Sequence, residues 1–188
     1  MELDHIAWTG PAIDDPDLLD QLPAQLVGLL QQVNGFIQYG GGLHVRGACV
    51  APAWHALRPP LEGPRALHRR YPSVAPDWIP FAQDCVGDQF LLADGAVLHL
   101  QAETGDIEAL DPTLTAFFKR VAADPVDALA MQPLQKLWAE GGHLAPGQLL
   151  SVYPPFCTAE SAGGVSVRPV SSLERQDWLA DFARTIAP

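Results

Sequence analysis

Basic residues are scarce in this sequence. Lys and Arg together number 11, against 22 Asp and Glu, so the formal net charge of the 188 residues is -11. Proteins that bind a phosphate backbone need clustered Lys and Arg to displace counterions. The longest basic cluster here is short and consists of Arg65, His68, Arg69 and Arg70. We therefore expect no direct binding of nucleic acid, and the acidity suits either solubility or the recognition of a basic partner.

Cysteines are also few and lie far apart. Cys49, Cys85 and Cys157 are odd in number and form no CxxC or Cys/His pair with zinc spacing. Neither a disulfide framework nor a zinc site is therefore expected. Each cysteine has apolar neighbours, which predicts that all three are small buried hydrophobic side chains.

Long apolar runs are absent as well. No stretch reaches the roughly 18 apolar residues that a membrane span needs. The first residues, Met-Glu-Leu-Asp-His, have neither the basic start nor the apolar run of a signal peptide. The sequence therefore predicts a protein of the reducing cytoplasm with no membrane partner.

What the sequence does contain is enough apolar material for one globular domain. Hydrophobic residues make up 48% of the chain. Their spacing predicts a helix at about 23–34 and a shorter helix at 16–21. Alternation over 43–48 predicts a half-buried strand. The proline-rich segment 51–77 is expected to be a long loop or a short helix around 52–57.

The next segment has the pattern of a β-meander. The predicted strands are residues 78–82, 89–93, 96–102 and 107–110. Asp94-Gly95 lies between the second and third strands, and Asp-Gly between alternating runs is a strong hairpin signal because both positions tolerate positive φ. Gln83-Asp84 is typical of a turn.

Helices are expected to follow this meander. Asp111 and Asp124 each precede a proline, which is typical of an N-cap with proline at the first helical position. Ser171 and Glu174 have capping-box spacing and predict the start of a last helix. The fold prediction is therefore a single α+β domain over 1–188, with an antiparallel sheet of about four to six strands flanked by N-terminal and C-terminal helices.

The order of these motifs resembles a known family. The sequence IPFAQD (79–84) is followed by GDQF (87–90), a hairpin and a helix that an Asp-Pro pair opens. With the preceding helix at 23–34, this order resembles the SUKH superfamily, which is named for a fungal cell-wall synthesis regulator and its bacterial relatives. The resemblance covers about residues 20–125, so 126–188 is interpreted as a C-terminal helical extension, which contains one strand-like segment at 148–152.

The resemblance implies a function as well as a fold. Many bacterial members of the superfamily are immunity proteins that bind and block a toxin, such as a nuclease or deaminase. The implied partner is therefore a cognate protein toxin, and the implied role needs no catalysis, cofactor or metal. The fungal relatives imply instead a regulatory scaffold with several weak partners. The sequence leaves open whether the chain forms a homodimer.

Asp84, Asp88 and Asp94 lie close together in the sequence and allow two interpretations. As a carboxylate cluster they would supply hard oxygen ligands for Mg²⁺ or Ca²⁺ and, with a histidine, a small metal-dependent hydrolase. As turn residues they would accept backbone N–H bonds. Their spacing does not match an EF-hand loop, so we expect the structural role and keep the hydrolase as the alternative.

The six histidines are scattered and match no catalytic motif. Neither HExxH nor GxSxG occurs. His99 alternates with Leu98 and Leu100, so it is expected on the solvent side of its strand with a structural role.

Four residues are candidates for partner binding. Trp54 lies in the proline-rich segment, where an aromatic side chain either anchors a partner or covers the core. Glu103, Asp106 and Glu108 surround the tip after the predicted hairpin. They would form an acidic knob that fits the basic cleft of a nuclease toxin. The alternative for these acidic residues is a solvated loop.

Overall fold

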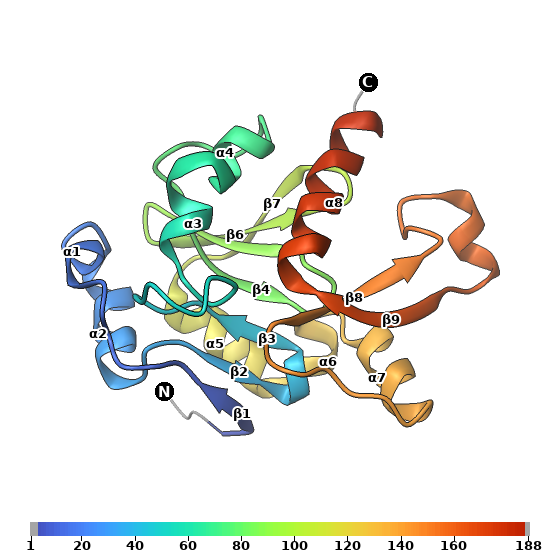
Figure 1. The fold of residues 1–188 in the computed structure, drawn as a ribbon, viewed down its shortest axis with the longest axis horizontal. Helices are drawn as coiled ribbons and strands as arrows, with labels where there is room; N and C mark the ends of the chain where they lie inside the picture. Colours follow the sequence, from blue (N-terminus) through green and yellow to red (C-terminus); the bar gives the residue numbers. More distant parts are fainter. Residues whose placement is uncertain (1–3, 187–188) are drawn as a thin grey trace.

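The computed structural model describes residues 4–186, and its central element is a seven-stranded sheet (Figure 1). The strands lie in sequence order, and every neighbouring pair is antiparallel. They are β1 (Ile6–Thr9), β2 (Phe36–Gln38), β3 (Leu43–Val45), β4 (Ile79–Asp84), β5 (Gln89–Ala93), β6 (Ala96–Gln101) and β7 (Asp106–Asp111). This confirms the α+β class, although the sheet has more strands than the four to six expected.

Short helices connect the strands and cover the sheet. The α-helices are α1 (Pro16–Leu19), α2 (Ala24–Gln32), α3 (Arg58–Leu61), α4 (Leu67–Arg70), α5 (Leu114–Ala123), α6 (Pro125–Ala128), α7 (Gln132–Ala139) and α8 (Ser172–Ile186). Three 3₁₀ turns are η1 (Tyr39–Gly41), η2 (Gly63–Arg65) and η3 (Ala159–Gly163). None of the helices within residues 4–186 is long and apolar enough to cross a membrane.

The hairpin between β5 and β6 has the predicted geometry. Asp94 and Gly95 both have positive φ, 48° and 86°, and Ala93 pairs with Ala96 across the turn. A two-residue turn of this kind follows the right-handed twist of the strands. The Asp-Gly prediction is therefore confirmed. The two-residue turn sets the register between β5 and β6, and this register determines which side chains of β6 lie on each face of the sheet.

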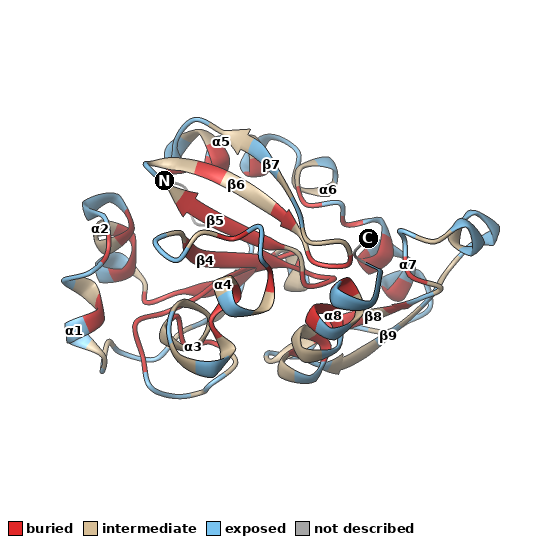
Figure 2. Ribbon diagram, turned by 90° about the horizontal axis from the view of Figure 1, so that it is seen from above, coloured by how far each residue is buried: buried red, intermediate tan, exposed pale blue. Residues whose placement is uncertain are grey.

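Helices lie on both faces of the sheet, as seen edge-on in Figure 2. On one face α2, α5 and α7 contribute to the larger apolar cluster, which includes Phe90 from β5 and Phe117 from α5. On the other face α4 and α8 contribute to a second cluster, which includes Leu91 and Leu179. Neighbouring residues of β5 thus point to opposite layers, as the period-two geometry of a strand requires.

The C-terminal region adds a second, two-stranded sheet. The hairpin of β8 (Gln148–Tyr153) and β9 (Ser166–Ser171) precedes α8. Strand β8 confirms the strand predicted at 148–152, and β9 adds a second strand to the expected helical extension. The backbone N–H of Leu150 donates to the carbonyl of Cys85 at 2.7 Å. Leu134 and Val152 belong to the larger apolar cluster. Residues 126–186 therefore complete the core of the main sheet.

Several local predictions are corrected. Strands β1, β2 and β9 were not expected, and the proline-rich segment folds into α3, η2 and α4 after residue 57. The N-cap of α5 is Thr113, whose Oγ1 accepts the N–H of Ala116 at 3.1 Å, because β7 extends through Asp111. Asp124 does cap α6, as predicted. Cys49 and Cys85 are buried, but Cys157 is exposed.

Candidate functional site

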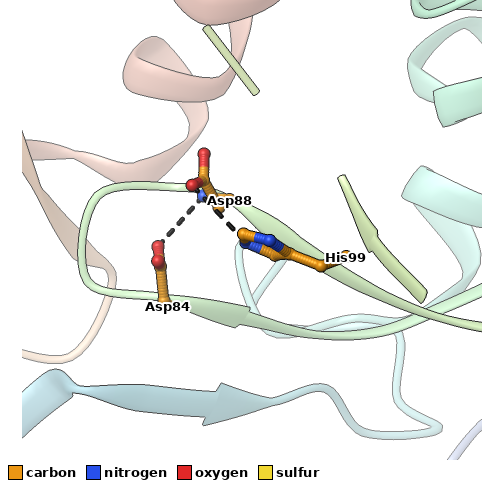
Figure 3. Close-up of side chains that lie close together, drawn as sticks. All are labelled: Asp84, Asp88 and His99. Atoms are coloured by element: carbon orange, nitrogen blue, oxygen red, sulfur yellow. Dashed lines mark hydrogen bonds and ion pairs between the residues drawn. The ribbon is translucent and has the colours of Figure 1, made fainter. Parts of the chain in front are cut away.

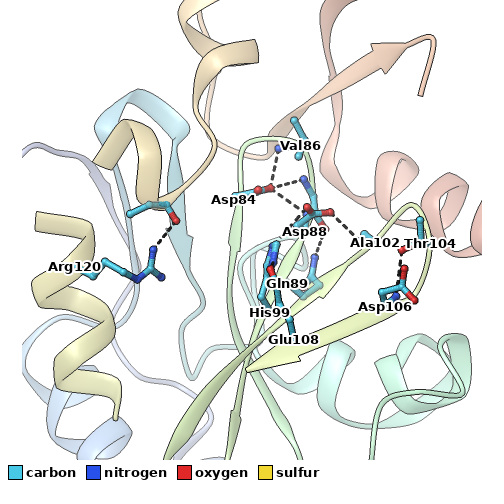
Figure 4. A network of polar contacts seen from close by, with 12 residues as sticks. Asp84, Val86, Asp88, Gln89, His99, Ala102, Thr104, Asp106, Glu108 and Arg120 are labelled. Atoms are coloured by element: carbon cyan, nitrogen blue, oxygen red, sulfur yellow. Dashed lines mark hydrogen bonds and ion pairs between the residues drawn. The ribbon is translucent and has the colours of Figure 1, made fainter. Parts of the chain in front are cut away.

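The turn between β4 and β5 is organised by one buried carboxylate. Asp84 Oδ1 accepts the backbone N–H groups of Val86, Gly87 and Asp88 at 2.9, 2.9 and 3.0 Å. These contacts surround Asp84 in Figure 4. The structural role predicted for Asp84 is confirmed, because three amide donors in this turn would otherwise lack an acceptor.

The environment of Asp84 also changes its titration. Burial, followed by the negative charge of Asp88, raises the pKa of this carboxyl to about 7. The imidazole of His99 and the amide donors of the turn act in the opposite direction. Asp84 therefore changes charge near neutral pH, where ordinary aspartates are fully ionised.

His99 is held between two carboxylates and is not the isolated solvent-facing residue expected from the sequence. Its Nδ1 lies 2.9 Å from Glu108 Oε1, and its Nε2 lies 3.5 Å from Asp88 Oδ2. Figure 3 shows the ring directed at Asp88. The ring also stacks on buried Phe90, with centroids 5.5 Å apart, so it faces the layer that contains α5.

The two carboxylates determine the charge of His99. Burial lowers the pKa of this imidazole, but pairing with Asp88, followed by pairing with Glu108, outweighs burial and raises the pKa to about 9. His99 is therefore an imidazolium at neutral pH. Asp88 also accepts the N–H of Ala102 at 2.8 Å, so it connects the turn to the end of β6 and does not bracket the turn alone as expected.

A cavity of about 230 Å³ opens beside this group at the end of the sheet. We call it the sheet-end cavity. Its lining is polar on one side and apolar on the other: Val86, Asp88, His99, Gln101, Glu103, Thr104, Phe156, Cys157, Arg175 and Leu179. Clefts that combine apolar walls, a few convergent polar groups and shifted pKa values are the usual places where proteins bind ligands.

Glu103 belongs to this cavity and not to an exposed knob. Only 9% of the residue is exposed. Its Oε2 accepts the backbone N–H of Cys157 at 3.1 Å, and its Oε1 lies 3.6 Å from Arg175 Nη2. The predicted acidic tip is therefore corrected at this position, because β7 begins only at Asp106 and residue 103 turns inward.

The other acidic candidates, Asp106 and Glu108, are exposed on β7. This strand is one edge of the seven-stranded sheet. Trp54 is half-buried and packs against Trp8, with ring centroids 4.9 Å apart, and against His44, with centroids 5.3 Å apart. The structure thus separates the four candidates into an edge-strand pair, a cavity residue and an aromatic cover.

Asp84, Asp88 and His99 lie close enough together to supply ligand atoms to one metal ion. One ligand atom from each of Asp84, Asp88 and His99 lies within 4.8 Å of the others. Carboxylate and imidazole donors suit a divalent transition metal. However, His99 must lose its proton before it can bind a metal, and its raised pKa opposes that loss at neutral pH.

A second polar network, which sequence reasoning missed, is buried beneath Trp54. Arg46 donates to Gln83 Oε1 at 2.7 Å. The Gln83 amide contacts His44 Nδ1 at 3.1 Å, and His44 Nε2 contacts His55 Nδ1 at 2.8 Å. His55 Nε2 reaches the carbonyl of Asn34 at 2.9 Å. No spacing in the sequence marks this network, because its members come from widely separated segments.

The carbonyl at the end of this network fixes the direction of every hydrogen bond. A carbonyl only accepts, so His55 Nε2 must carry a proton and its Nδ1 must accept from His44 Nε2. His44 Nδ1 then accepts from Gln83. Burial lowers the pKa of His44 well below its ordinary value and that of His55 to about 4. Both rings are therefore neutral and have both nitrogens engaged.

Comparison with known proteins adds information about the fold. No family model matches the sequence, and no curated protein matches it. The structure is similar to the crystal structure of Atu4351 from Agrobacterium tumefaciens, with a TM-score of 0.53 and 13% sequence identity. The match covers 94% of this chain and 83% of that chain. At this identity the likeness shows a shared α+β fold alone.

Proposed function

We propose that this protein is a SUKH-like immunity protein that binds and neutralises a cognate bacterial toxin through an acidic surface. The order of motifs over residues 20–125 supports this proposal. The observation that carries it is the pair of exposed carboxylates, Asp106 and Glu108, on edge strand β7. A toxin that acts on nucleic acid has a basic cleft, and complementary charge accelerates association with such a partner.

The edge position of β7 suits this role. Its inner side pairs with β6, and no further strand of the described sheet lies on its outer side. Carboxylates along an edge oppose pairing with a second copy of the same strand. A basic partner would remove that repulsion, so the same residues that prevent self-association favour the toxin.

The neighbouring gene product provides the direct test. The purified chain and that product should form a stable one-to-one complex in a pull-down assay, at concentrations near 1 μM or below. The double substitution Asp106→Lys and Glu108→Lys should slow association by about tenfold at low salt, with a smaller effect at high salt.

The matched control is Glu140→Lys with Glu160→Lys, which makes the same change of charge at two exposed residues away from β7. This control should retain most of the association rate. A complex whose association rate responds equally to both double variants would contradict an acidic interface on β7. Absence of any complex would contradict the immunity role itself.

A metal-dependent hydrolase is the second candidate, and the proximity of Asp84, Asp88 and His99 favours it. Binding of Mn²⁺ or Zn²⁺ can be measured by calorimetry on the wild-type chain and on Asp88→Asn. The immunity proposal predicts no specific binding at pH 7. Stoichiometric binding that Asp88→Asn abolishes would favour the hydrolase instead.

A further inference from the structure

Arg175 is a buried cation with too few partners. Only 4% of the residue is exposed. Its Nε donates to the carbonyl of Val86 at 3.4 Å, and its guanidinium lies over the ring of Trp178, 4.7 Å from the centroid. Its Nη groups make no hydrogen bond to any residue within the described range 4–186. Because a guanidinium carries five N–H donors, most of them are left for another acceptor.

Glu103 is the anion that faces this cation, and it is also incompletely paired. Its Oε1 is buried and accepts no hydrogen bond from the part of the chain that the structure describes. The distance of 3.6 Å from Oε1 to Arg175 Nη2 is too long for a hydrogen bond. Arg175 and Glu103 therefore form a loose ion pair, and buried charged groups whose hydrogen-bonding capacity is only partly filled are costly. Both side chains line the sheet-end cavity, so a molecule there would lie next to this ion pair.

Charged groups of both signs line the sheet-end cavity. Asp88 and Glu103 supply carboxylates, and Arg175 supplies a guanidinium, whereas both nitrogens of His99 already face carboxylates. A simple anion would meet two carboxylates, and a simple cation would meet a guanidinium. The lining therefore disfavours ligands that carry a net charge of either sign, and favours a ligand that presents both charges at once.

We propose that the sheet-end cavity binds the zwitterionic head group of a small α-amino acid. The ligand carboxylate accepts hydrogen bonds from the Nη groups of Arg175, and its ammonium group donates to Glu103 Oε1. Val86, Leu179 and Phe156 form the apolar side of the cavity and contact an aliphatic side chain. This site is separate from the toxin-binding surface proposed for β7.

L-valine and two of its analogues test the class of ligand on the unmodified protein. Isovalerate has the carboxylate without the ammonium group, and isobutylamine has the amine without the carboxylate. Amide chemical shifts of residues 84–104 should change saturably with L-valine. Each analogue should bind at least about tenfold more weakly, because each leaves one buried charge of the cavity unpaired.

Two variants test the residues. Arg175→Gln and Glu103→Gln should each weaken L-valine binding about tenfold or more, because each removes one charge-assisted contact. Arg184→Gln is the matched control, since Arg184 is an exposed arginine of the same helix. Glu103→Gln preserves the shape of the side chain, so it decides the question if Arg175→Gln does not fold.

Three results would overturn the proposal. The first is no saturable shift with L-valine at concentrations on the order of 10 mM. The second is equal affinity for L-valine and isovalerate, which would mean that the cavity recognises a carboxylate alone. The third is unchanged affinity in a folded Glu103→Gln. None of these results bears on the toxin complex, because the experiment uses this chain alone.

Discussion

The histidines of the sheet lie in two opposite electrostatic environments. His44 belongs to a buried network of Arg46, Gln83, His55 and Asn34, which contains no carboxylate. His99 lies between the carboxylates of Asp88 and Glu108 beside the sheet-end cavity. Burial lowers the pKa of His44, whereas carboxylate partners raise that of His99 to about 9.

The two regions therefore differ in whether their charge can change near neutral pH. In the His44 network both ring nitrogens of His44 and of His55 have hydrogen-bond partners, so the network holds β3, β4 and the segment after β3 together without changing charge near neutral pH. The His99 region contains Asp84, whose burial raises its pKa to about 7, and it opens into a cavity. We therefore expect substitutions in the first region to reduce stability, and those in the second to alter charge and ligand binding.

The largest effect is expected from Arg46→Met. Arg46 is buried and donates to the carbonyls of Pro80 and Ala82 and to the side-chain oxygens of Gln83 and Gln89. Removing the guanidinium leaves these acceptors unpaired, which should reduce the free energy of unfolding by about 3 kcal/mol or more. Urea denaturation measures the loss, and Arg168→Met at an exposed position of β9 should change stability by less than about 0.5 kcal/mol.

An intermediate effect is expected at Asp84. Asp84→Ala leaves three turn amides without their acceptor and should reduce the free energy of unfolding by about 2 kcal/mol. Asp84→Asn retains an acceptor oxygen and should cost much less at pH 7. Comparable losses in the two variants, measured by urea denaturation at that pH, would show that the carboxylate charge and not amide capping stabilises the turn.

The Asn variant should also remove a pH dependence. The pKa of Asp84 is raised in the folded state from 3.8 to about 7, so the folded protein binds the extra proton. Its contribution to stability is fully present below pH 3.8 and is lost as pH rises through 7. A denaturation series from pH 5 to pH 8 should therefore decline less steeply for Asp84→Asn than for the wild type.

The smallest effect is expected from His99→Gln. Because the folded-state pKa of His99 is raised from 6.5 to about 9, its contribution is fully present below pH 6.5 and is lost as pH rises through 9. The variant should be less stable than the wild type at pH 6 and should approach it near pH 10. A stability difference that is constant over this range would mean that His99 contributes packing and not charge.

Much of the fold was predictable because local chemistry determines it. The Asp94-Gly95 turn, the helical spacing of apolar residues in α2 and the Asp124 cap each depend on a few neighbouring residues. The strands β1 and β2 were missed because they are only four and three residues long and become strands through pairing. Asp111 was misplaced as a cap because the ladder with β6 continues through it.

The candidate site was less predictable because its residues come from distant parts of the chain. Asp84 and Asp88 are close in sequence, but Glu103 and Arg175 are separated by 72 positions, from 103 to 175. Alternation along β6 could not show that the position of His99 lies between two carboxylates. Likewise, Glu103 points inward because it contacts Arg175 of α8 and the backbone N–H of Cys157. The residues near Glu103 in the sequence indicate neither contact.

The most direct test of the contrast between the two environments is the protonation state of each histidine. Long-range ¹H–¹⁵N spectra of the imidazole rings, recorded from pH 5 to pH 10, distinguish the imidazolium from each neutral tautomer. At pH 7 we predict an imidazolium at His99, and neutral rings protonated on Nε2 at His44 and His55. A neutral His99 at pH 7, or a charged ring at His44 or His55, would contradict the account.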